Sequence, residues 1–303
     1  MDTSAIIPSN LPVVSVIVPT TCEKTRSEFI ERAIASILDQ AGAELDVIIV
    51  VNGDRLDTAL LNQLESTAQL RVIRIAEGNV SVARYAGVAN ARGSFFCFLD
   101  DDDEFLPGAI KQRLDIFDRF PDADIVVTNG YVFTDHDEPL VTQPLESQIN
   151  GNPAKSFLNC NWFASPASLF RANRIEPAIF DMKYKYFEWT YLFFLLLSQR
   201  KSIRFDSCLT YRIYRDHSYS VSKSTEYYSS YPAFLLALND LPLDTPIRKI
   251  ISGKYAASLN SLSNMQMSQG CLRQAWIAHI KCLIHGGWRY LPYTRHLLLA
   301  SLK

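Results

Sequence analysis

Apolar runs that suit buried β-strands alternate with helical stretches through the first 130 residues of the chain. The strand runs are rich in β-branched and aromatic residues and carry few charges; they are Val13–Val18, Asp46–Val51, Leu70–Ile75, Ser94–Leu99 and Asp124–Thr128. Helical periodicity lies between them, at 29–38, 56–65 and 80–91. Continuous apolar strands joined through helices are typical of parallel sheets covered on both faces. The sequence therefore predicts an α/β fold with a doubly wound, mostly parallel sheet.

Two of the expected helices carry start signals. Thr25 followed by Glu28 predicts a capping box before the first helix, and Pro107 suits the first residue of the helix after the fourth strand. Beyond residue 150 the pattern is looser, with a buried helix expected over Glu188–Gln199 and a strand over Ile203–Tyr214. Helical segments dominate the last part of the chain. We therefore expect one domain over 1–225 and a helical C-terminal region over 226–303.

Composition excludes several classes of protein. The chain has 30 basic and 32 acidic residues and a net charge of −2, so no global field favours nucleic acid or an anionic membrane. Its six cysteines are scattered without a C-x-x-C pair, which disfavours a disulfide framework or a zinc cluster and fits a reducing compartment. No signal peptide is recognisable at the N-terminus, and the apolar run Tyr191–Leu197 is far below the ~20 residues of a spanning helix. We expect a cytoplasmic protein, at most peripheral on the inner face of a membrane.

Five acids follow the fourth strand run without a break. Phe95–Leu99 leads directly into Asp100–Asp103 and then Glu104. Open α/β sheets bind ligands at the carboxyl ends of their strands, and clustered carboxylates are costly unless a cation or donors offset them. Hard oxygen donors suit Mg²⁺ or Mn²⁺, which keep few protein ligands and complete their shell with phosphate and water. A solvated acidic turn that caps the next helix is the alternative that needs no ligand.

Two other metal-binding motifs resemble this acidic string locally. An EF-hand loop that begins at Asp100 needs glycine at its sixth position, which is Phe105. A P-loop NTPase needs G-x-x-x-x-G-K-[ST]; here Gly253-Lys254 is followed by tyrosine, and Arg248 stands where the first glycine belongs. Both motifs are therefore excluded.

Four segments together resemble a known family. VSVIVPTTC (14–22), DVIIVVNGD (46–54), GNVSVARYAGVANARGSFFCFLDDDDEFLP (78–107) and YFEWTYLFFLL (186–196) look like family-two inverting glycosyltransferases of the GT-A fold, in that family's order and approximate spacing. The resemblance covers most of residues 13–220. It implies a Rossmann-like nucleotide-binding half over about 13–130 and an acceptor half over about 131–225.

The resemblance implies roles for the acids at the end of the fourth strand. Asp100 and Asp102 match the family's D-x-D acids, with Asp102 as ligand of Mn²⁺ or Mg²⁺ and Asp100 near the ribose or the metal. Asp101 lies between them and is expected in the same cofactor-binding cluster.

The resemblance also implies residues that hold the nucleotide. Pro19 and Thr20 end the first strand where the family's chain passes the base. Asn52 stands where many members carry an aspartate that binds uracil, and because an amide both donates and accepts, the base need not be uracil. Arg84 matches an arginine that would pair with the diphosphate, although Tyr85 replaces the usual asparagine; a surface salt bridge is the alternative for Arg84.

The reaction needs a general base, since attack by an acceptor hydroxyl leaves an oxygen that must lose its proton. Family members use the acid of an E-D pair that opens a helix in the second half, where this chain has Phe187-Glu188. Glu188 is therefore the candidate base and Asp181 the reserve, while helix capping is the alternative for Glu188. In the segment 211–220, which resembles the family's Y-R-x-H-x-x-S, His217 would ligate the metal or touch the phosphates, and Arg212 or Arg215 would offset leaving-group charge.

Two aromatic segments remain open between two interpretations. Asn161–Ser165 would form either an acceptor wall or a core strand. The C-terminal aromatic and basic residues would form either a helical cap or a membrane contact near a lipid-linked acceptor; they are Trp276, His279, Trp288, Arg289, Tyr290, Tyr293 and Arg295.

The function that the resemblance implies is inverting transfer of a sugar. The donor is a nucleotide-diphosphate sugar and the acceptor a hydroxyl of a saccharide or a lipid-linked saccharide, in cell-surface polysaccharide or glycolipid synthesis, with no nucleic-acid partner. One alternative is a GT-A-fold nucleotidyltransferase, which usually has a glycine-rich loop after its first strand; Thr20–Ser27 contains no glycine. The other alternative is a catalytically inactive sugar- or nucleotide-binding module, which the altered Asn52, Tyr85 and Phe187 keep open.

Overall fold

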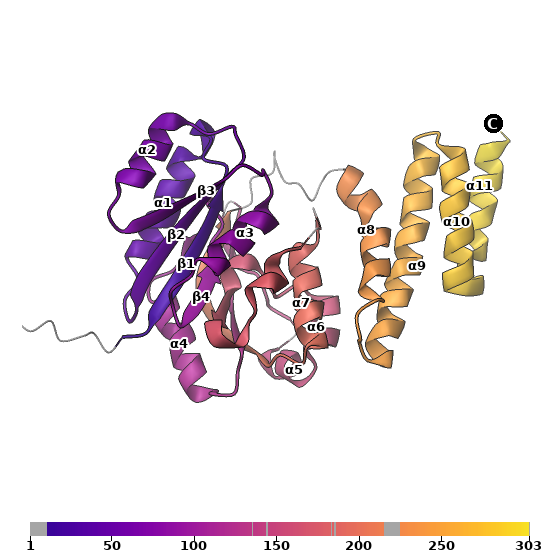
Figure 1. Cartoon of the computed structure of the whole chain (residues 1–303). Helices are drawn as coiled ribbons and strands as arrows, with labels where there is room; N and C mark the ends of the chain where they lie inside the picture. The colour runs from indigo at the N-terminus through magenta and orange to yellow at the C-terminus, as the bar shows by residue number, and fades with distance from the viewer. Residues whose placement is uncertain are drawn as a thin grey trace, which may run out of the picture. The chain divides into compact units, whose positions relative to one another are not determined.

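A single sheet of nine strands organises the first part of the chain in the computed structural model, which describes residues 11–134, 136–143, 145–182, 184, 186–214 and 225–302 (Figure 1). The strands are β1 (Val13–Thr20), β2 (Glu44–Asn52), β3 (Leu70–Ile75), β4 (Phe95–Phe98), β5 (Glu104–Phe105), β6 (Ile125–Phe133), β7 (Asp137–Pro139), β8 (Ser168–Arg171) and β9 (Ile203–Tyr214). Their order is β3-β2-β1-β4-β8-β6-β9-β5, and β7 pairs with β6.

The first four strands form the parallel part of this sheet. β1 lies between β2 and β4, and β3 pairs with β2, all in parallel register. Beyond β4 the sheet is mixed, because β8 runs antiparallel between β4 and β6, whereas β6 and β9 are parallel. The order reverses direction at β1 and β4, and this reversal is where doubly wound sheets open a crevice for ligands.

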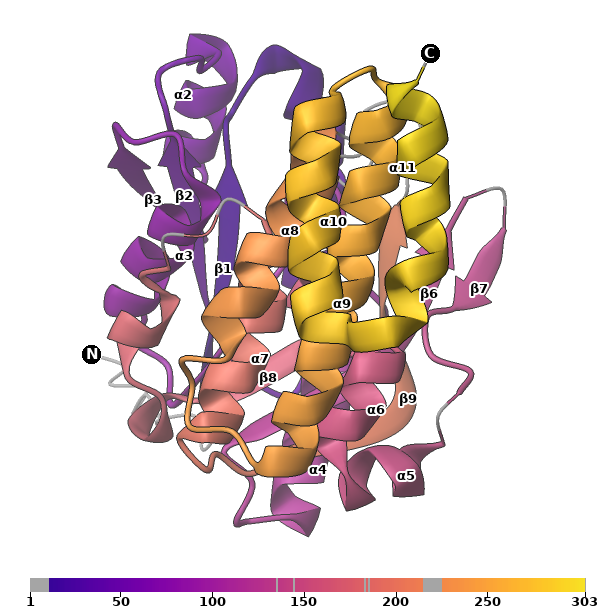
Figure 2. The ribbon, with the colours of Figure 1, turned by 90° about the vertical axis from the view of Figure 1, so that its right-hand side faces the viewer.

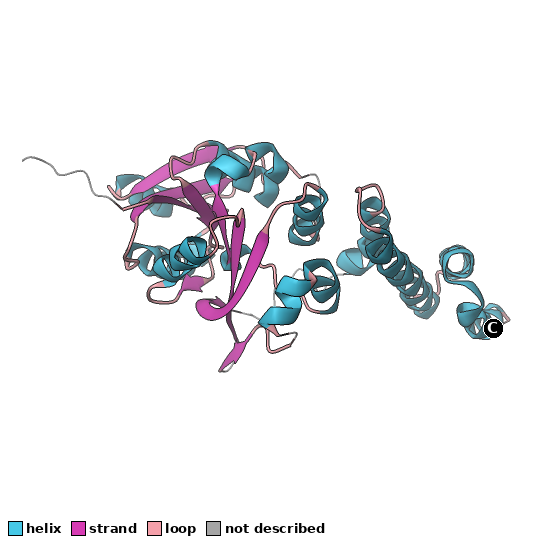
Figure 3. Cartoon of the chain, turned by 90° about the horizontal axis from the view of Figure 1, so that it is seen from below, coloured by secondary structure: helices cyan, strands magenta, loops and turns pink. Residues whose placement is uncertain are grey.

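The helices of the first part cover both faces of the sheet, as Figures 1 and 3 show. They are α1 (Ser27–Leu38), α2 (Thr58–Ser66), α3 (Val80–Ala89), α4 (Ala109–Arg119), α5 (Glu146–Gly151), α6 (Pro153–Asn159) and α7 (Glu188–Ser198). α1 buries Ile30, Ala33, Ile34 and Ile37, whereas Phe29 and Leu38, which the helical periodicity over 29–38 puts on the same face, are exposed. α3 packs closely on β1, since a Cβ on Gly87 would stand 2.3 Å from a methyl carbon of Ile17.

α4 is fastened to the sheet by one fully buried arginine. Arg113 donates to the carbonyl of Pro166 at 2.5 Å and to the hydroxyls of Thr210 and Thr128 at 2.7 Å and 3.3 Å. Its guanidinium carbon lies 4.9 Å from the centre of the Phe105 ring. Burial lowers the pKa of Arg113, and its hydrogen-bond partners are all neutral.

An aromatic core underlies the end of β4. The rings of Phe96 and Phe170 stack with centroids 5.0 Å apart, and Phe98 lies 5.1 Å from Phe180 and 5.6 Å from Trp189. Offset and edge-to-face ring pairs of this kind add rigidity beyond area burial. The core therefore holds the carboxyl end of β4, and the acids that follow it, in a fixed place.

The predicted α/β fold with a helical C-terminal region is confirmed, but both predicted helix starts are wrong. α1 begins at Ser27 after a 3₁₀ turn over Lys24–Arg26, so Thr25 lies inside the turn and caps nothing. α4 begins at Ala109, and its N-cap is Gly108 in the left-handed conformation (φ 75°) rather than Pro107. A turn that glycine alone adopts easily has displaced the start by two residues.

The chain divides into two compact units, residues 1–193 with 200–215 and residues 194–199 with 216–303. The second unit contains α8 (Thr225–Leu238), α9 (Thr245–Ser268), α10 (Leu272–Gly286) and α11 (Thr294–Ser301). α9 packs against α8 and α10, and α10 packs against α11 (Figures 1 and 2). No helix within the described residues is both long and apolar enough to cross a membrane.

Candidate active site

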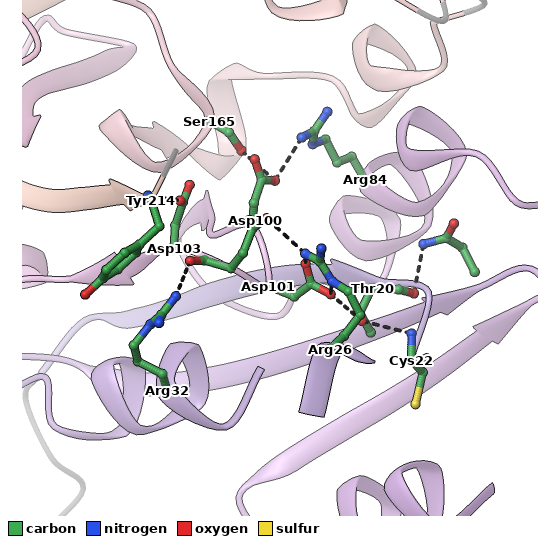
Figure 4. Close-up of polar contacts among 12 residues, drawn as sticks. Thr20, Cys22, Arg26, Arg32, Arg84, Asp100, Asp101, Asp103, Ser165 and Tyr214 are labelled. Atoms are coloured by element: carbon green, nitrogen blue, oxygen red, sulfur yellow. Dashed lines mark hydrogen bonds and ion pairs between the residues drawn. The ribbon is translucent and has the colours of Figure 1, made fainter. Parts of the chain in front are cut away.

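The acids that follow β4 form a tight turn at the carboxyl end of the parallel strands. The backbone N–H of Asp103 donates to the carbonyl of Asp100 at 3.1 Å and closes the turn. The four carboxylates have different surroundings, and Figure 4 shows those of Asp100, Asp101 and Asp103. Asp101 and Asp103 are buried, whereas the side chains of Asp100 and Asp102 keep 33% and 42% of their exposure. Only the first and third acids therefore face solvent.

Asp101 is held by the loop that follows β1. It accepts a hydrogen bond from Thr20 Oγ1 at 2.6 Å and from Arg26 Nε at 3.0 Å, and a second Arg26 nitrogen pairs with its other oxygen. The Thr20 hydroxyl also accepts from the backbone N–H of Cys22 at 3.0 Å. Cys22 adopts a left-handed backbone (φ 54°), which is unusual for a residue with a side chain. Asp101 thus ties the β1 loop to the acidic turn.

Arg26 reaches beyond Asp101 to a solvent-facing acid. Its Nη2 lies 3.1 Å from Asp102 Oδ2. Burial, and then the charge of Asp100, raise the pKa of Asp102, while Arg26 acts in the opposite direction. Burial, and then the charges of Asp100 and Asp102, raise the pKa of Asp103 strongly. The four carboxylates of the turn therefore outnumber Arg26 and Arg84, the two cations that pair with them among the described residues.

A second layer of basic side chains supports the turn from the β5–β9 side. Arg32 donates to the backbone carbonyl of Asp102 at 2.5 Å, and its guanidinium carbon lies 3.8 Å from the centre of the Tyr214 ring. Arg212 is paired with Glu104 and, at 2.6 Å, with Asp137. Arg212 lies on β9, and through these two carboxylates it links β9 to β5 and β7.

Arg84 connects the acidic turn to α7. Its Nη2 lies 2.9 Å from Asp100 Oδ1, and its Nη1 lies 3.3 Å from Glu188 Oε1. The side chain is almost completely buried and its guanidinium carbon lies 5.2 Å from the centre of the Trp189 ring. Ser165 also donates to Asp100 Oδ1, at 3.3 Å. One cation therefore brings Asp100 and the candidate base Glu188 to the same place.

Glu188 opens α7 with its side chain 19% exposed. The residue before it, Phe187, has a left-handed backbone (φ 62°), a conformation that costs a bulky residue free energy and that often occurs at functional sites. Asp181, the reserve candidate for the base, is exposed and follows a 3₁₀ turn over Pro177–Phe180.

The residues expected beside the nucleotide base lie at the ends of β1 and β2. Pro19 and Thr20 are buried in β1, where they pair with Val50 and Val51. Asn52 is buried at the end of β2, and its Nδ2 donates to the carbonyl of Thr20 at 2.9 Å. This bond fixes the amide so that its Oδ1, which accepts no hydrogen bond from the described residues, is left for another donor.

The structure brings most of the predicted site residues together and leaves some apart. Asp100, Asp101, Asp102, Arg84 and Glu188 form one connected set, whereas Trp162 and Phe163 are fully buried in the aromatic core. The segment Asn161–Ser165 is an irregular loop and not the predicted core strand. Its two large aromatic side chains nevertheless lie in the core. His217 and Arg215 lie outside the described residues.

The sequence predicted no place at the acidic turn for Arg26, Ser165 or Trp189; Ser165 was expected only as part of the segment Asn161–Ser165. Arg26 follows β1 closely, and β1 pairs with β4, so a basic residue in that loop meets the acids once the strand order is known. Ser165 and Trp189 carry no signal of their own, because their partners lie 65 and about 105 residues away in sequence.

The exposed acids suit a hard divalent cation. Asp100 and Asp102 offer carboxylate oxygens at a turn where burial, and then the neighbouring charge of Asp100, raise the pKa of Asp102. Within the described part of the chain, no three His, Cys, Asp or Glu side chains converge to hold a metal by themselves. The donor set therefore fits a metal that takes few protein ligands and fills its shell from a phosphate ligand.

Comparison with known proteins identifies the family. Residues 15–216 match the family described as Glycosyl transferase family 2. The chain belongs to this family. One relative, the uncharacterized glycosyltransferase EpsJ of Bacillus subtilis, is 37% identical over 106 residues, which are 34% of this chain and 30% of EpsJ. A protein of Rickettsia prowazekii, the uncharacterized glycosyltransferase RP339, is 26% identical over 41% of this chain and 38% of its own length.

Two further comparisons extend over most of the chain. The GalNAc(5)-diNAcBac-PP-undecaprenol β-1,3-glucosyltransferase of Campylobacter jejuni is 24% identical over 287 residues, 90% of this chain and 87% of that protein. The S. aureus TarS structure with UDP-GlcNAc superposes with a TM-score of 0.61 at 15% identity, over 94% of this chain and 87% of that one. This likeness concerns the fold, and it confirms the GT-A-type architecture that the sequence predicts.

Proposed function

We propose that this chain transfers a sugar from a nucleoside-diphosphate donor to a hydroxyl of a saccharide or lipid-linked acceptor, with inversion at the anomeric carbon. Family membership supports a glycosyltransferase. The observation that carries the proposal is the bridge by Arg84 between Asp100 and Glu188, because it joins a diphosphate-side acid and a potential base at the ligand-binding end of a parallel sheet.

Mn²⁺ or Mg²⁺ is the proposed cofactor, held by Asp102 with Asp100 beside it. When bound, such an ion neutralises charge on the diphosphate as it leaves. Arg26, now 3.1 Å from Asp102, is a long and half-exposed side chain that could exchange this carboxylate for a phosphate oxygen. Asp101 would act only indirectly, since Thr20 and Arg26 already occupy its carboxylate. His217 remains the second metal-ligand candidate.

The nucleotide would lie across the ends of β1 and β2. Asn52 Oδ1 would accept from an N–H of the base, while the bond from its Nδ2 to Thr20 fixes the orientation of the amide. Arg84 would face the diphosphate from α3, and its pairing with Asp100 and Glu188 keeps the guanidinium in place before the donor arrives. The half over 13–130 is thus proposed to bind donor, and the half over 131–225 acceptor.

Glu188 is the proposed general base. In the transfer, the acceptor oxygen forms a bond to the anomeric carbon, the bond to the diphosphate oxygen breaks on the opposite face, and the hydroxyl proton passes to Glu188. Helix α7 starts at Glu188, so the N–H groups of its first turn point toward the N-terminal end of the helix, where Glu188 stands. The left-handed Phe187 aims this first turn at Arg84 and the acids.

The acceptor proposal takes its direction from the Campylobacter jejuni relative, whose name describes a glucosyltransferase acting on an undecaprenol-linked saccharide. A comparable lipid-linked acceptor would put this protein in cell-surface polysaccharide or glycolipid synthesis, at the inner face of a membrane. Peripheral contact through the C-terminal helices would then bring enzyme and acceptor to one surface.

The first experiment is a panel of radiolabelled nucleotide sugars incubated with the protein and Mn²⁺. A transferase hydrolyses its preferred donor slowly even without acceptor, and with acceptor it gives a product of inverted anomeric configuration. A nucleotidyltransferase would instead form a sugar nucleotide from a nucleoside triphosphate and a sugar phosphate. A binding module would retain donor unchanged. Either of these two outcomes would refute the proposed transfer.

The second experiment separates the two candidate bases. Glu188→Gln keeps the hydrogen bond to Arg84 but cannot take a proton, so turnover should fall by roughly 10²–10⁴ while donor affinity changes little. Asp181→Asn is the matched control and should retain turnover. If the two variants exchange these results, Asp181 is the base.

A further inference from the structure

The charges of this chain are strongly segregated along its length. Eight of the 30 lysines and arginines lie in residues 245–303, and none of the 32 acids does. The remaining 244 residues therefore have 22 basic and 32 acidic side chains, a net charge of −10, while the C-terminal 59 residues have +8. The overall net charge of −2 hides this division. A segment with only positive charges is suited to an anionic surface.

The same segment exposes a row of large apolar side chains. Ile277, Ile280 and Ile284 follow one another at spacings of three and four residues, which places them along one side of α10, and Trp288 comes directly after the helix ends. Their exposed fractions are 47%, 51%, 72% and 86%. We call these four residues the α10 stripe. Such exposure of three isoleucines and a tryptophan is costly in water unless a partner covers them.

The opposite side of α10 is the one that packs within the second unit. Its small residues Ala275, Ala278 and Cys282 are buried, and Cys282 Sγ lies 3.2 Å from the carbonyl of Ala256 in α9. Because the helix is already anchored through this side, the α10 stripe is not needed for its packing. Figure 1 shows α10 between α9 and α11 in the second unit.

Basic residues lie on α10 and in the segment that follows it. Arg273 and Lys281 lie on α10, and Arg289 and Arg295 follow in the next two elements; all four are exposed. An interfacial helix typically combines an apolar side, including tryptophan, with lysine and arginine along its edges. The apolar side enters the boundary between headgroups and acyl chains, and each basic residue near the surface pairs with anionic headgroups.

We propose that the α10 stripe and these four basic residues dock on the surface of an anionic lipid bilayer. The inference deepens the peripheral contact proposed above for the C-terminal helices, because it names the docking residues and the lipid charge on observations that do not depend on sugar transfer. A second copy of the chain fits less well: an isologous pair would bring two segments of +8 face to face. Docking is peripheral, since no described helix can span a membrane.

The test is sedimentation of the full chain with vesicles, without donor or acceptor. We expect binding to phosphatidylcholine vesicles that contain about 30% phosphatidylglycerol and little binding to phosphatidylcholine alone, with a loss as NaCl rises from about 0.1 M to about 1 M. The double variant Ile284→Asp, Trp288→Asp should weaken binding by at least about tenfold, because it places two charges in the acyl boundary. Replacing Lys281 and Arg289 by Gln should weaken it by about fivefold for each residue.

Leu145→Asp is the matched control, since Leu145 is 54% exposed but belongs to the first unit; it should bind vesicles like the wild type. Folding of each variant is checked by circular dichroism. Wild-type protein that does not bind anionic vesicles, or equal binding by the Ile284, Trp288 double variant, overturns the proposal. A concentration-dependent dimer in light scattering that the double variant abolishes also overturns it, in favour of self-association. Sugar transfer is measured separately on the donor panel, so the two proposals can fail independently.

Discussion

Arg84 offers the sharpest test of how the candidate site is held together. Arg84→Met keeps a long unbranched side chain against Trp189 but removes the cation between Asp100 and Glu188. Breaking a fully buried ion pair costs about 3–5 kcal/mol, whereas an exposed pair is worth at most about 1 kcal/mol. Arg84 is buried, but its partners keep 33% and 19% of their exposure, so the loss lies between these limits. We expect the free energy of unfolding to fall by roughly 2–3 kcal/mol, including the contact with Trp189.

A double-mutant cycle tests the cause of that loss. Part of it comes from two carboxylates left without a cation, so Glu188→Gln should be less harmful in the Arg84→Met background than in the wild type. The coupling free energy should be roughly 1 kcal/mol or more. Arg84→Lys is the matched control with unchanged charge; because an ammonium cannot bridge both acids as a planar guanidinium does, it should lose about half as much.

The assay is equilibrium unfolding in urea, followed by tryptophan fluorescence and far-ultraviolet circular dichroism. Additive effects of Arg84→Met and Glu188→Gln, or a loss below about 0.5 kcal/mol for Arg84→Met, would refute the reasoning that this cation holds the two acids together.

Three further perturbations address the metal, recognition of the nucleotide base, and the pH dependence of stability. Asp102→Asn should reduce turnover by roughly 10² or more while circular dichroism stays unchanged, and calorimetry should show that EDTA weakens nucleotide binding to the wild type; equal binding with and without divalent ions contradicts this expectation. Asn52→Asp should change the ranking of uridine, thymidine, guanosine and cytidine diphosphates, by roughly 1–3 kcal/mol per hydrogen bond gained or lost; an unchanged ranking removes Asn52 from the site. Burial lowers the pKa of His279, whose Nε2 is 2.7 Å from Thr294 Oγ1, so this residue stabilises the fold at pH values above the ordinary histidine pKa and the contribution is lost as pH falls below it. Unfolding between about pH 8 and pH 5 should therefore show a steeper decline for the wild type than for His279→Gln, and parallel declines would argue against it.

Local patterns predicted the elements that depend on neighbours in sequence. The strands Leu70–Ile75 and Ile203–Tyr214 have the predicted bounds, because alternation and β-branched content are properties of the segment itself. Helix starts failed at Thr25 and Pro107, where a 3₁₀ turn and a left-handed glycine decide the first residue. The 3₁₀ turn and the left-handed glycine both depend on the path of the chain after the preceding strand. Capping residues carry no information about that path.

The sequence did not predict which distant strands pair with each other. β8 lies between β4 and β6 in antiparallel register, and the two-residue strand β5 exists only because it pairs with β9. The same limit applies to the candidate site. The acids were recognisable because they are contiguous, whereas Arg26 and Ser165 join them only through strand order and loop packing. Assignment of Asp102, Asn52 and Glu188 to their roles came from the family resemblance and stays a prediction.

The buried Arg113 has a consequence for the cooperativity of the first unit. Its three hydrogen bonds end on β6, on β9 and on the turn that precedes β8, while its ring contact is with β5. If α4 opened by itself, these neutral acceptors would lose their donor. The Arg113 cation would leave a site in which it pairs with no carboxylate of the described residues. Separate opening of α4 is therefore disfavoured, and the helix and the mixed half of the sheet behave as one folding unit. The half of the enzyme proposed to receive the acceptor thus gains its rigidity from a residue on the helix that immediately follows the acidic turn.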